Sequence, residues 1–379
     1  MCLLAVGFAA ALLSHRSEAA VGQTYDLRAD FGAKCDGKSD DTAAIQAWLG
    51  ALGPQTRAVA PPGDCRFRVP LVIDAESYAL SGSGPYATVF RYVGKATDVD
   101  LLTIKHGDGE VRNISLSNFK IVSDTMMTGG AAIHFRKLVR STISDVVAGG
   151  QDSNGYLWDG FWFDQVDSVY MSQFEARGRA DCVRVNGSLG GGPKADLGLI
   201  QAKIGGCRIG IHVAGGFGGL YVDQADVIGN DRNLLIDNSA VREGNREIFL
   251  GSTSTLDTSK DDSIFVDDPL ANDGTLDVAG WVASGGGSGV HIKSWNGKLN
   301  LRGSELFNFK GDGARIDDSR TYVRISGGLA IRGNQGFGIN ATVPTKRIYS
   351  AAKPFENARG SYSANCSVEA VGSARPTAE

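Results

Sequence analysis

Three aspartates stand directly before short apolar runs of the chain, in the settings WDGFWF, ADCVRV and GDGARI. They are Asp159, Asp181 and Asp312. If the runs after Asp159 and Asp181 are neighbouring strands, their carboxyl groups lie roughly 5 Å apart, a separation typical of retaining glycosidases. Two carboxyl groups this close push their pKa values apart, which supplies an acid and a base for hydrolysis. The alternative is turn chemistry, because aspartate before a strand commonly bonds to nearby backbone.

Further candidate carboxylates lie in and around the segment 151–185. Glu175 and Asp226 occupy the same position in two strand-like runs, two runs apart, which predicts a second pair about 9–10 Å apart. Asp164 directly follows the run FWF and is another candidate. The segment also holds tryptophans and arginines that we expect to bind substrate: Trp158, Trp162, Arg177 and Arg179. Tryptophan beside carboxylates is typical of a sugar site; the alternative is that Trp158 packs beneath a loop.

A row of larger side chains occupies one repeated position, between two apolar neighbours in each run. Its members are His134, Trp162, Arg184, His212, His291 and Arg315. Aromatic faces stack on sugar rings and arginine pairs with carboxylates, so the row is typical of a binding surface for a long, acidic polysaccharide. The alternative is that these are ordinary surface residues. Successive histidines are about three runs apart, roughly 14 Å, so they are too distant to share one metal.

The elements that would position these residues form a soft repeat from about residue 110 onward. Apolar side chains alternate with small or polar ones within each run, as in a half-buried strand. With 51 glycines for turns, this pattern predicts a parallel β-solenoid. A β-propeller has a longer repeat and a sandwich needs none. The runs begin at Ile114, Ile143, Val169, Leu199, Leu220, Ile248, Leu276, Leu299 and Val323.

The block YDLRADFGAKCDGKSDDTAAIQAWLGAL, followed by APPGDCRFRV, gives the most specific signal. It resembles the N-terminal entry of the pectate-lyase-like superfamily of right-handed parallel β-helices. That group includes secreted polysaccharide lyases, glycosidases and phage tailspike depolymerases. The resemblance covers about residues 25–70. It implies an all-β, right-handed, single-stranded parallel β-helix over residues 20–350, with its entry motif and cap at 30–70 and an N-terminal capping α-helix.

The four aspartates of this block, Asp30, Asp36, Asp40 and Asp41, have a structural explanation. Asp36 followed by glycine is turn chemistry. Asp40 or Asp41 can N-cap a helix that starts at Thr42, whose apolar face can close the open end of the solenoid. A calcium loop is the alternative, but the spacing does not match an EF-hand.

Charge and the N-terminal stretch bound the setting of the protein. The net charge of -4 argues against a general binder of nucleic acid or anionic membrane. The stretch MCLLAVGFAAALLSHRSEAAVGQ predicts a signal peptide over residues 1–19, hence a secreted or periplasmic protein; the alternative is a buried N-terminal segment. Its apolar run is too short to span a bilayer.

Five cysteines remain once the signal peptide is removed, so at least one stays unpaired. In an exported protein, Cys35 and Cys65 are expected to form a disulfide, which stabilises by roughly 3–4 kcal/mol in the chain-entropy model. The alternative is two free buried thiols. The pairing of Cys182, Cys207 and Cys366 is left open.

The motifs that accompany pectin cleavage are missing: NTD, GHG and RIK do not occur, so pectin is not supported as substrate. The resemblance implies a secreted enzyme that cleaves glycosidic bonds of a polysaccharide, with hydrolysis favoured over β-elimination. A hydrolase needs no cofactor, whereas a lyase would add calcium. The alternative is a non-catalytic glycan-binding or phage-derived fibre protein, and an epimerase ranks third. Homo-oligomerisation is left open, and residues 351–379 are expected to form a cap or tail.

Overall fold

The computed structural model describes residues 22–370, apart from 151–154, 188–195, 304, 327–328, 346–347 and 352. The expected signal peptide, residues 1–19, lies outside the described residues. Within the described part of the chain, no helix is long and apolar enough to cross a membrane.

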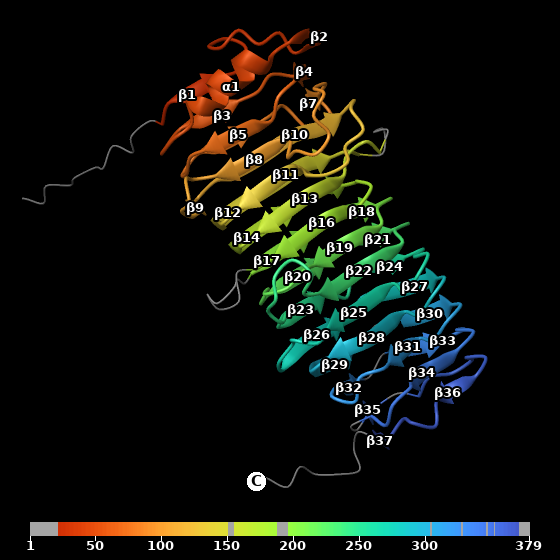
Figure 1. Ribbon diagram of the computed structural model, residues 1–379. Coiled ribbons are helices and arrows are strands. Elements are labelled where there is room, and N and C mark those ends of the chain that lie inside the picture. Colours follow the sequence, from red (N-terminus) through yellow and green to blue (C-terminus); the bar gives the residue numbers. More distant parts are fainter. Residues whose placement is uncertain are drawn as a thin grey trace, which may run out of the picture.

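The chain winds into an all-β, right-handed parallel solenoid of about 11 turns, with successive coils stacked along one axis (Figure 1). One face of the solenoid is a sheet of 12 strands. In chain order these are β5 (Leu71–Asp74), β8 (Leu102–Lys105), β11 (Ala131–Arg136), β13 (Asp159–Asp164), β16 (Asp181–Asn186), β19 (Ile209–Val213), β22 (Arg232–Asp237), β25 (Ile264–Asp268), β28 (Val290–Trp295), β31 (Ala314–Ile316), β34 (Phe337–Ala341) and β36 (Gly360–Tyr362).

The remaining 25 strands join into a second sheet, which runs along the solenoid in two columns. The strands are β1 (Thr24–Asp26), β2 (Asp36–Asp40), β3 (Arg57–Val59), β4 (Gly63–Phe67), β6 (Ala79–Ser81), β7 (Thr88–Tyr92), β9 (Val111–Arg112), β10 (Ser115–Ser123), β12 (Leu138–Ala148), β14 (Asp167–Ser172), β15 (Glu175–Ala176), β17 (Leu197–Ile200), β18 (Lys203–Gly205), β20 (Leu220–Asp223), β21 (Asp226–Ile228), β23 (Glu247–Leu250), β24 (Thr255–Asp257), β26 (Gly274–Val278), β27 (Trp281–Gly285), β29 (Gly297–Leu301), β30 (Glu305–Phe309), β32 (Tyr322–Ile325), β33 (Ala330–Arg332), β35 (Ile348–Ser350) and β37 (Val368–Ala370). The last two elements of the chain, β36 and β37, continue both sheets into the segment 351–379.

Side-chain alternation explains both the core and the outer faces. Within each strand of the 12-stranded sheet, every second side chain points inward and stacks on its counterpart one coil away, as Phe135 does on Phe163 at 4.8 Å. Between the two columns of the other sheet, a single residue with positive φ turns the chain, for example Gln173 and Gln201 (φ 53° and 55°). Because inward positions fill the core, the residues between them must face outward, and that alternation fixes the candidate site.

The N-terminal region contains one helix, α1 (Thr42–Gly50), which begins at the predicted residue. The helix buries its apolar side, formed by Ile45, Trp48 and Leu49, and contacts β4 and β5. Asp40 accepts hydrogen bonds from the N–H and hydroxyl of Thr42 at the helix start, at 3.1 and 2.5 Å. That the helix protects the open end of the core stays a prediction.

The other aspartates of the entry block also bond to backbone. Asp41 accepts the N–H groups of Lys34 and Cys35, and Asp36 accepts those of Lys38 and Ser39. This agrees with the structural role expected for the cluster.

Two disulfides tie neighbouring coils together. The expected Cys35–Cys65 bond is present, and a second bond joins Cys182 to Cys207. Cys366 is free. The Cys182–Cys207 bond links the coil that carries β16 to the coil that carries β19, so it fixes two strands of the candidate site.

Candidate active site

The predicted row of outward side chains is present on the 12-stranded sheet. Strand register places His134 beside Trp162, Trp162 beside Arg184, and Arg184 beside His212. The row continues over five further coils through Leu235, Phe265, His291, Arg315 and Asn340. One position in each coil therefore builds a continuous line of side chains along the solenoid.

Each histidine of the row belongs to a repeated unit of three residues. Its Nδ1 lies 2.7 Å from an aspartate of the preceding coil, and a second aspartate, on the following coil, faces its Nε2. We call these the His134 unit, the His212 unit and the His291 unit. Their members are Asp100, His134 and Asp164; Asp181, His212 and Asp237; and Asp262, His291 and Asp317.

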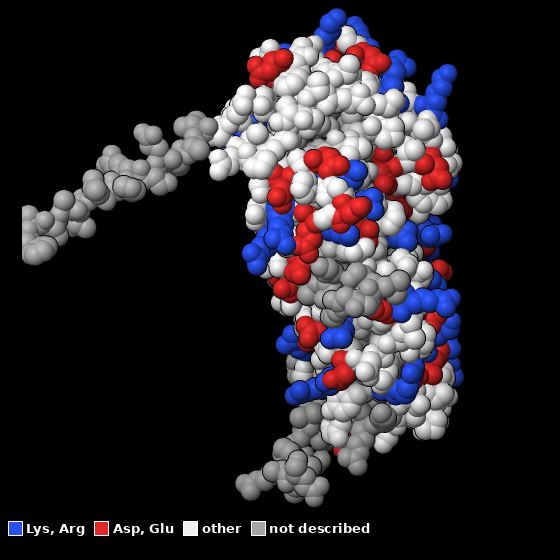
Figure 2. Space-filling model, turned by 60° about the vertical axis from the view of Figure 1, so that its left-hand side comes forward, with Lys and Arg blue, Asp and Glu red and all other residues white. Residues whose placement is uncertain are grey.

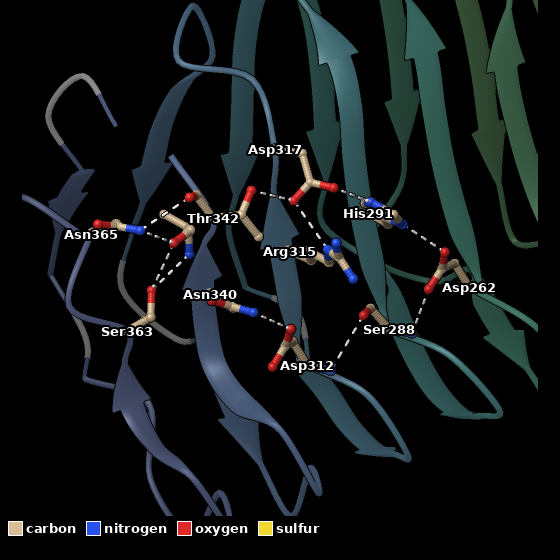
Figure 3. Close-up of polar contacts among 11 residues, drawn as sticks. Asp262, Ser288, His291, Asp312, Arg315, Asp317, Asn340, Thr342, Ser363 and Asn365 are labelled. Carbon is tan, nitrogen blue, oxygen red and sulfur yellow. Dashed lines mark hydrogen bonds and ion pairs between the residues drawn. The ribbon is translucent and has the colours of Figure 1, made fainter. Parts of the chain in front are cut away.

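Two of the units are closed, because both ring nitrogens bond to a carboxylate. His212 Nε2 lies 3.1 Å from Asp237, and His291 Nε2 lies 2.9 Å from Asp317 (Figure 3). Burial by itself lowers the pKa of His212, but the bonds and charges of its two aspartates outweigh burial and raise the pKa to about 9. The same balance raises the pKa of His291. Both rings are therefore held as imidazolium cations that connect three successive coils.

The His134 unit is open. Nδ1 bonds to Asp100 at 2.7 Å, but Nε2 is 4.0 Å from Asp164 Oδ2. Nε2 is buried and has no hydrogen-bond partner among the described residues. Because a carboxylate only accepts, Nδ1 carries a proton, and in the neutral ring Nε2 then presents a lone pair. A histidine oriented in this way by an aspartate is the arrangement of a general base.

Trp162 and Arg184 flank this histidine. The rings of His134 and Trp162 stack at 4.0 Å and 2°. The Arg184 guanidinium, on the next coil, lies 4.7 Å from the Trp162 ring, and its buried Nε has no partner within the described residues. Both faces of Trp162 are thus covered by protein. Stacking of a sugar ring on Trp162, which the sequence led us to expect, does not fit this geometry.

Asn186 joins two of these elements. It accepts the indole N–H of Trp162 and donates to Asp164 Oδ1, both at 2.6 Å. Asn186 is buried, and its two hydrogen bonds hold Trp162 and Asp164 in place at the edge of the site.

The predicted pair Asp159 and Asp181 lies on adjacent strands, β13 and β16. Asp159 accepts the backbone N–H of Asp181 at 2.9 Å, while Asp181 holds His212. Burial, and then the charge of Asp181, raises the pKa of Asp159 to about 7. The turn chemistry considered as the alternative is realised here as well, since Asp312 and Asp262 accept the N–H of the following coil in the same way. Both members of the pair are almost fully buried, at 4% and 3% exposure.

The second predicted pair lies elsewhere, on the 25-stranded sheet. Glu175 and Asp226 are two coils apart, as expected, but Lys203 stands between them. Glu175 accepts hydrogen bonds from Tyr86 and Arg177, each at 2.8 Å, whereas Asp226 is exposed. The structure therefore does not bring this pair to His134.

The remaining two predicted ligands, Trp158 and Arg179, lie together beside β13. The Arg179 guanidinium is 5.9 Å from the Trp158 ring, which packs against the hydrophobic core. This is the packing role considered as the alternative for Trp158.

Sequence reasoning missed Asp100, Asn186, Asp237, Asp262 and Asp317. A signal was present, because the first aspartates of the three units are 81 residues apart in both steps. Three segments, 100–164, 181–237 and 262–317, each hold an aspartate, a histidine and an aspartate at matching places of three successive coils. We call these segments blocks; comparing them would have found the partners of each histidine.

No family model and no curated protein matches the chain. Solved structures do. The A-module of the mannuronan C-5 epimerase AlgE4 of Azotobacter vinelandii superposes with a TM-score of 0.64 at 16% identity, over 92% of this chain and 98% of that chain. The catalytic domain of Agl-KA gives 0.55 at 12% identity, over 92% and 68%. ORF18 of Geobacillus virus E2 gives 0.52 at 12% identity, over 92% and 62%. The chain has the right-handed parallel β-helix fold of these structures. At these identities the likeness concerns the fold alone.

Proposed function

We propose that the protein is an enzyme acting on an acidic polysaccharide, and that it removes the proton next to a sugar carboxylate. This step begins both β-elimination and C-5 epimerisation. The observation that carries the proposal is the buried Nε2 of His134, which has no hydrogen-bond partner among the described residues, with Arg184 two coils away on the opposite face of Trp162. Abstraction of such a proton requires a base and a cation that offsets the charge developing on the sugar carboxylate.

The residues have distinct parts in this step. His134 Nε2 takes the C-5 proton, and Asp100 stabilises the imidazolium that forms. The electron pair of the broken C–H bond moves into the carboxylate, where Arg184 offsets the extra negative charge. The pair then either expels the oxygen at C-4, which takes the proton held by His134 or one from water so that the chain is cleaved, or takes a proton from water on the opposite face, which inverts C-5.

The outward row suits a polymer rather than a small molecule, because its side chains form one continuous line over many coils. The name of one similar structure, a mannuronan C-5 epimerase, supports a polysaccharide substrate. The net charge of -4 gives no general attraction for an acidic polymer, and on the face that Figure 2 presents, acidic and basic side chains are intermingled. Recognition of an acidic sugar therefore depends on the local Arg184.

Hydrolysis is the second candidate, and a specific observation favours it. Asp159, whose pKa is raised to about 7, could serve as the acid beside the carboxyl group of Asp181. Both carboxyls are already engaged, Asp159 by the backbone N–H of Asp181 and Asp181 by His212, which counts against it. Proton abstraction by His134 thus ranks above the hydrolysis that the sequence favoured.

Calcium, which the sequence left possible for a lyase, stays a prediction. Within the described residues, the one group of three potential metal ligands is Cys35, Asp41 and Cys65, and its cysteines form a disulfide. No step of the proposal uses a metal. We also propose that the protein works outside the cytoplasm, since two disulfides persist mainly in oxidising compartments.

The deciding experiment incubates the protein with a panel of acidic and neutral polysaccharides in D₂O. New ultraviolet absorbance from an unsaturated uronate means elimination, and deuterium at C-5 without chain cleavage means epimerisation. Reducing ends without either signal would replace the proposal by hydrolysis. No reaction, together with retention on an immobilised glycan, would favour a non-catalytic binder. His134→Gln tests the site, and the matched His291→Gln controls for loss of a row histidine.

A further inference from the structure

The three units use the same residue types at equivalent places, yet only the His134 unit is open among them. The distance from Nε2 to the second aspartate is 3.1 Å for His212, 2.9 Å for His291 and 4.0 Å for His134. Asp164 therefore stays farther from its histidine than Asp237 and Asp317 do, although an ionised carboxylate attracts an imidazole ring once the ring is protonated.

Asn186 is placed to keep Asp164 at this distance. Indole N–H only donates, so the side-chain oxygen of Asn186 must face Trp162 and its NH₂ must face Asp164. An asparagine fits both partners, whereas an aspartate could not donate to Asp164. Trp162 is itself stacked between His134 and Arg184 and so provides a fixed anchor. Asn186 therefore links the stacked Trp162 ring to the Asp164 carboxylate through two hydrogen bonds.

The other two units lack such a link between a stacked ring of the row and the second aspartate. In the His291 unit, the side chain from the next coil that bonds to Asp317 is exposed Thr342, at 2.8 Å (Figure 3). In the His212 unit, Asp237 is bonded by Ser239 of its own turn. Neither contact runs to a stacked ring of the row, and in both units the aspartate reaches its histidine.

We propose that Asn186 is a positioning residue that keeps His134 available as a base by holding Asp164 away from Nε2. Without it, Asp164 would turn to Nε2 as its counterparts do, and a second carboxylate would favour the imidazolium, which cannot accept a proton. The consequence for catalysis rests on the proposed function. The structural claim does not, because it can be measured without any substrate.

The experiment reads the protonation of each histidine Nε2 from ¹⁵N chemical shifts of the full protein at neutral pH. The chain has 5 histidines, so His→Gln variants can assign the signals. In the wild type, His134 Nε2 should be unprotonated, while His212 and His291 carry protons on both nitrogens. In Asn186→Ala, His134 Nε2 should become protonated. The double variant Asn186→Ala with Asp164→Asn should restore the wild-type signal, and the control Thr342→Val should leave His134 unchanged.

An unchanged His134 signal in folded Asn186→Ala would overturn the inference, as would a protonated Nε2 that persists in the double variant. The signals of His212 and His291 report whether the variant is folded. If Asn186→Ala does not fold, Trp162→Phe removes only the indole anchor and should move the His134 signal in the same direction; no movement overturns the inference too. On an active substrate, Asn186→Ala should lower kcat at least about tenfold with little change in KM. A wild type inactive on every substrate would refute the proposed function while leaving the ¹⁵N result to stand or fall alone.

Discussion

The His134 unit and the His291 unit contain the same three residue types, held at the same three places of successive coils, and differ by about 1 Å at one contact. In the His291 unit, an imidazolium joins Asp262 of the coil before to Asp317 of the coil after. In the His134 unit, the ring bonds to one carboxylate, and its Nε2 has no hydrogen-bond partner among the described residues. The triad alone therefore does not decide between a structural cross-link and a base; the surrounding residues do.

The largest expected effect separates the two units by activity. His134→Gln should lower kcat by about 10²–10⁴-fold, because it removes the general base, whereas His291→Gln should keep nearly full activity per folded molecule. Product formation on the substrate found by the polysaccharide panel is the measurement. Equal losses in both variants would mean that the open and closed units do not differ in function.

A second effect concerns pH and the closed units. The pKa of His212 is raised from 6.5 to about 9, so its contribution to stability is full below pH 6.5 and is lost as pH rises through about 9. The free energy of unfolding should fall over this window by up to about 3 kcal/mol, and His291 contributes in the same direction. Urea unfolding at several pH values measures the slope. His212→Gln should flatten it, and an unchanged slope would show that the ring is not held as a cation.

A third effect tests the cross-link directly. His291→Gln should cost about 2 kcal/mol of unfolding free energy near pH 7, because two bonds to charged partners are lost. His134→Gln should cost less, since that ring has a single such bond. Urea titrations of both variants provide the test, provided that the unfolding free energy depends equally steeply on urea concentration in both. The reverse order of stabilities would contradict the prediction.

The smallest effect concerns Asp159, which precedes the closed His212 unit. Its pKa is raised from 3.8 to about 7, so the stability gained from its protonated form is lost as pH rises through about 7. Asp159→Asn keeps an oxygen for the N–H of Asp181 and should stabilise the protein at pH 8 by about 1 kcal/mol. Thermal unfolding checks the gain. If the variant also lost all activity, the hydrolysis mechanism would displace the role given to His134.

Much of the fold could be predicted because it depends on short-range patterns. Alternation within each run assigned His134, Trp162, Arg184 and His212 to one outward row, and the coil repeat placed them on adjacent coils. The start of the helix at Thr42 and the Cys35–Cys65 disulfide followed from local chemistry in the same way.

The pairing of side chains across turns could not be predicted equally well. Which aspartate reaches which histidine depends on how the turns before and after each strand place Asp100 and Asp164, and these turns differ in length from coil to coil. The stacking of Trp162 between His134 and Arg184 is likewise a matter of rotamers, which the sequence pattern does not contain. The Cys182–Cys207 bond was within reach, since its separation of 25 residues is about one coil.

The three blocks also set the step in which this molecule can change size. Coils contact only their neighbours, so removing one coil would bring unlike turns together, whereas removing one full repeat of 81 residues, the step from Asp100 to Asp181, would rejoin matching positions. A shortened chain that keeps the first and last blocks should then preserve the outward row without a break. The solenoid should therefore lengthen or shorten in steps of three coils, whether by design or by gene duplication.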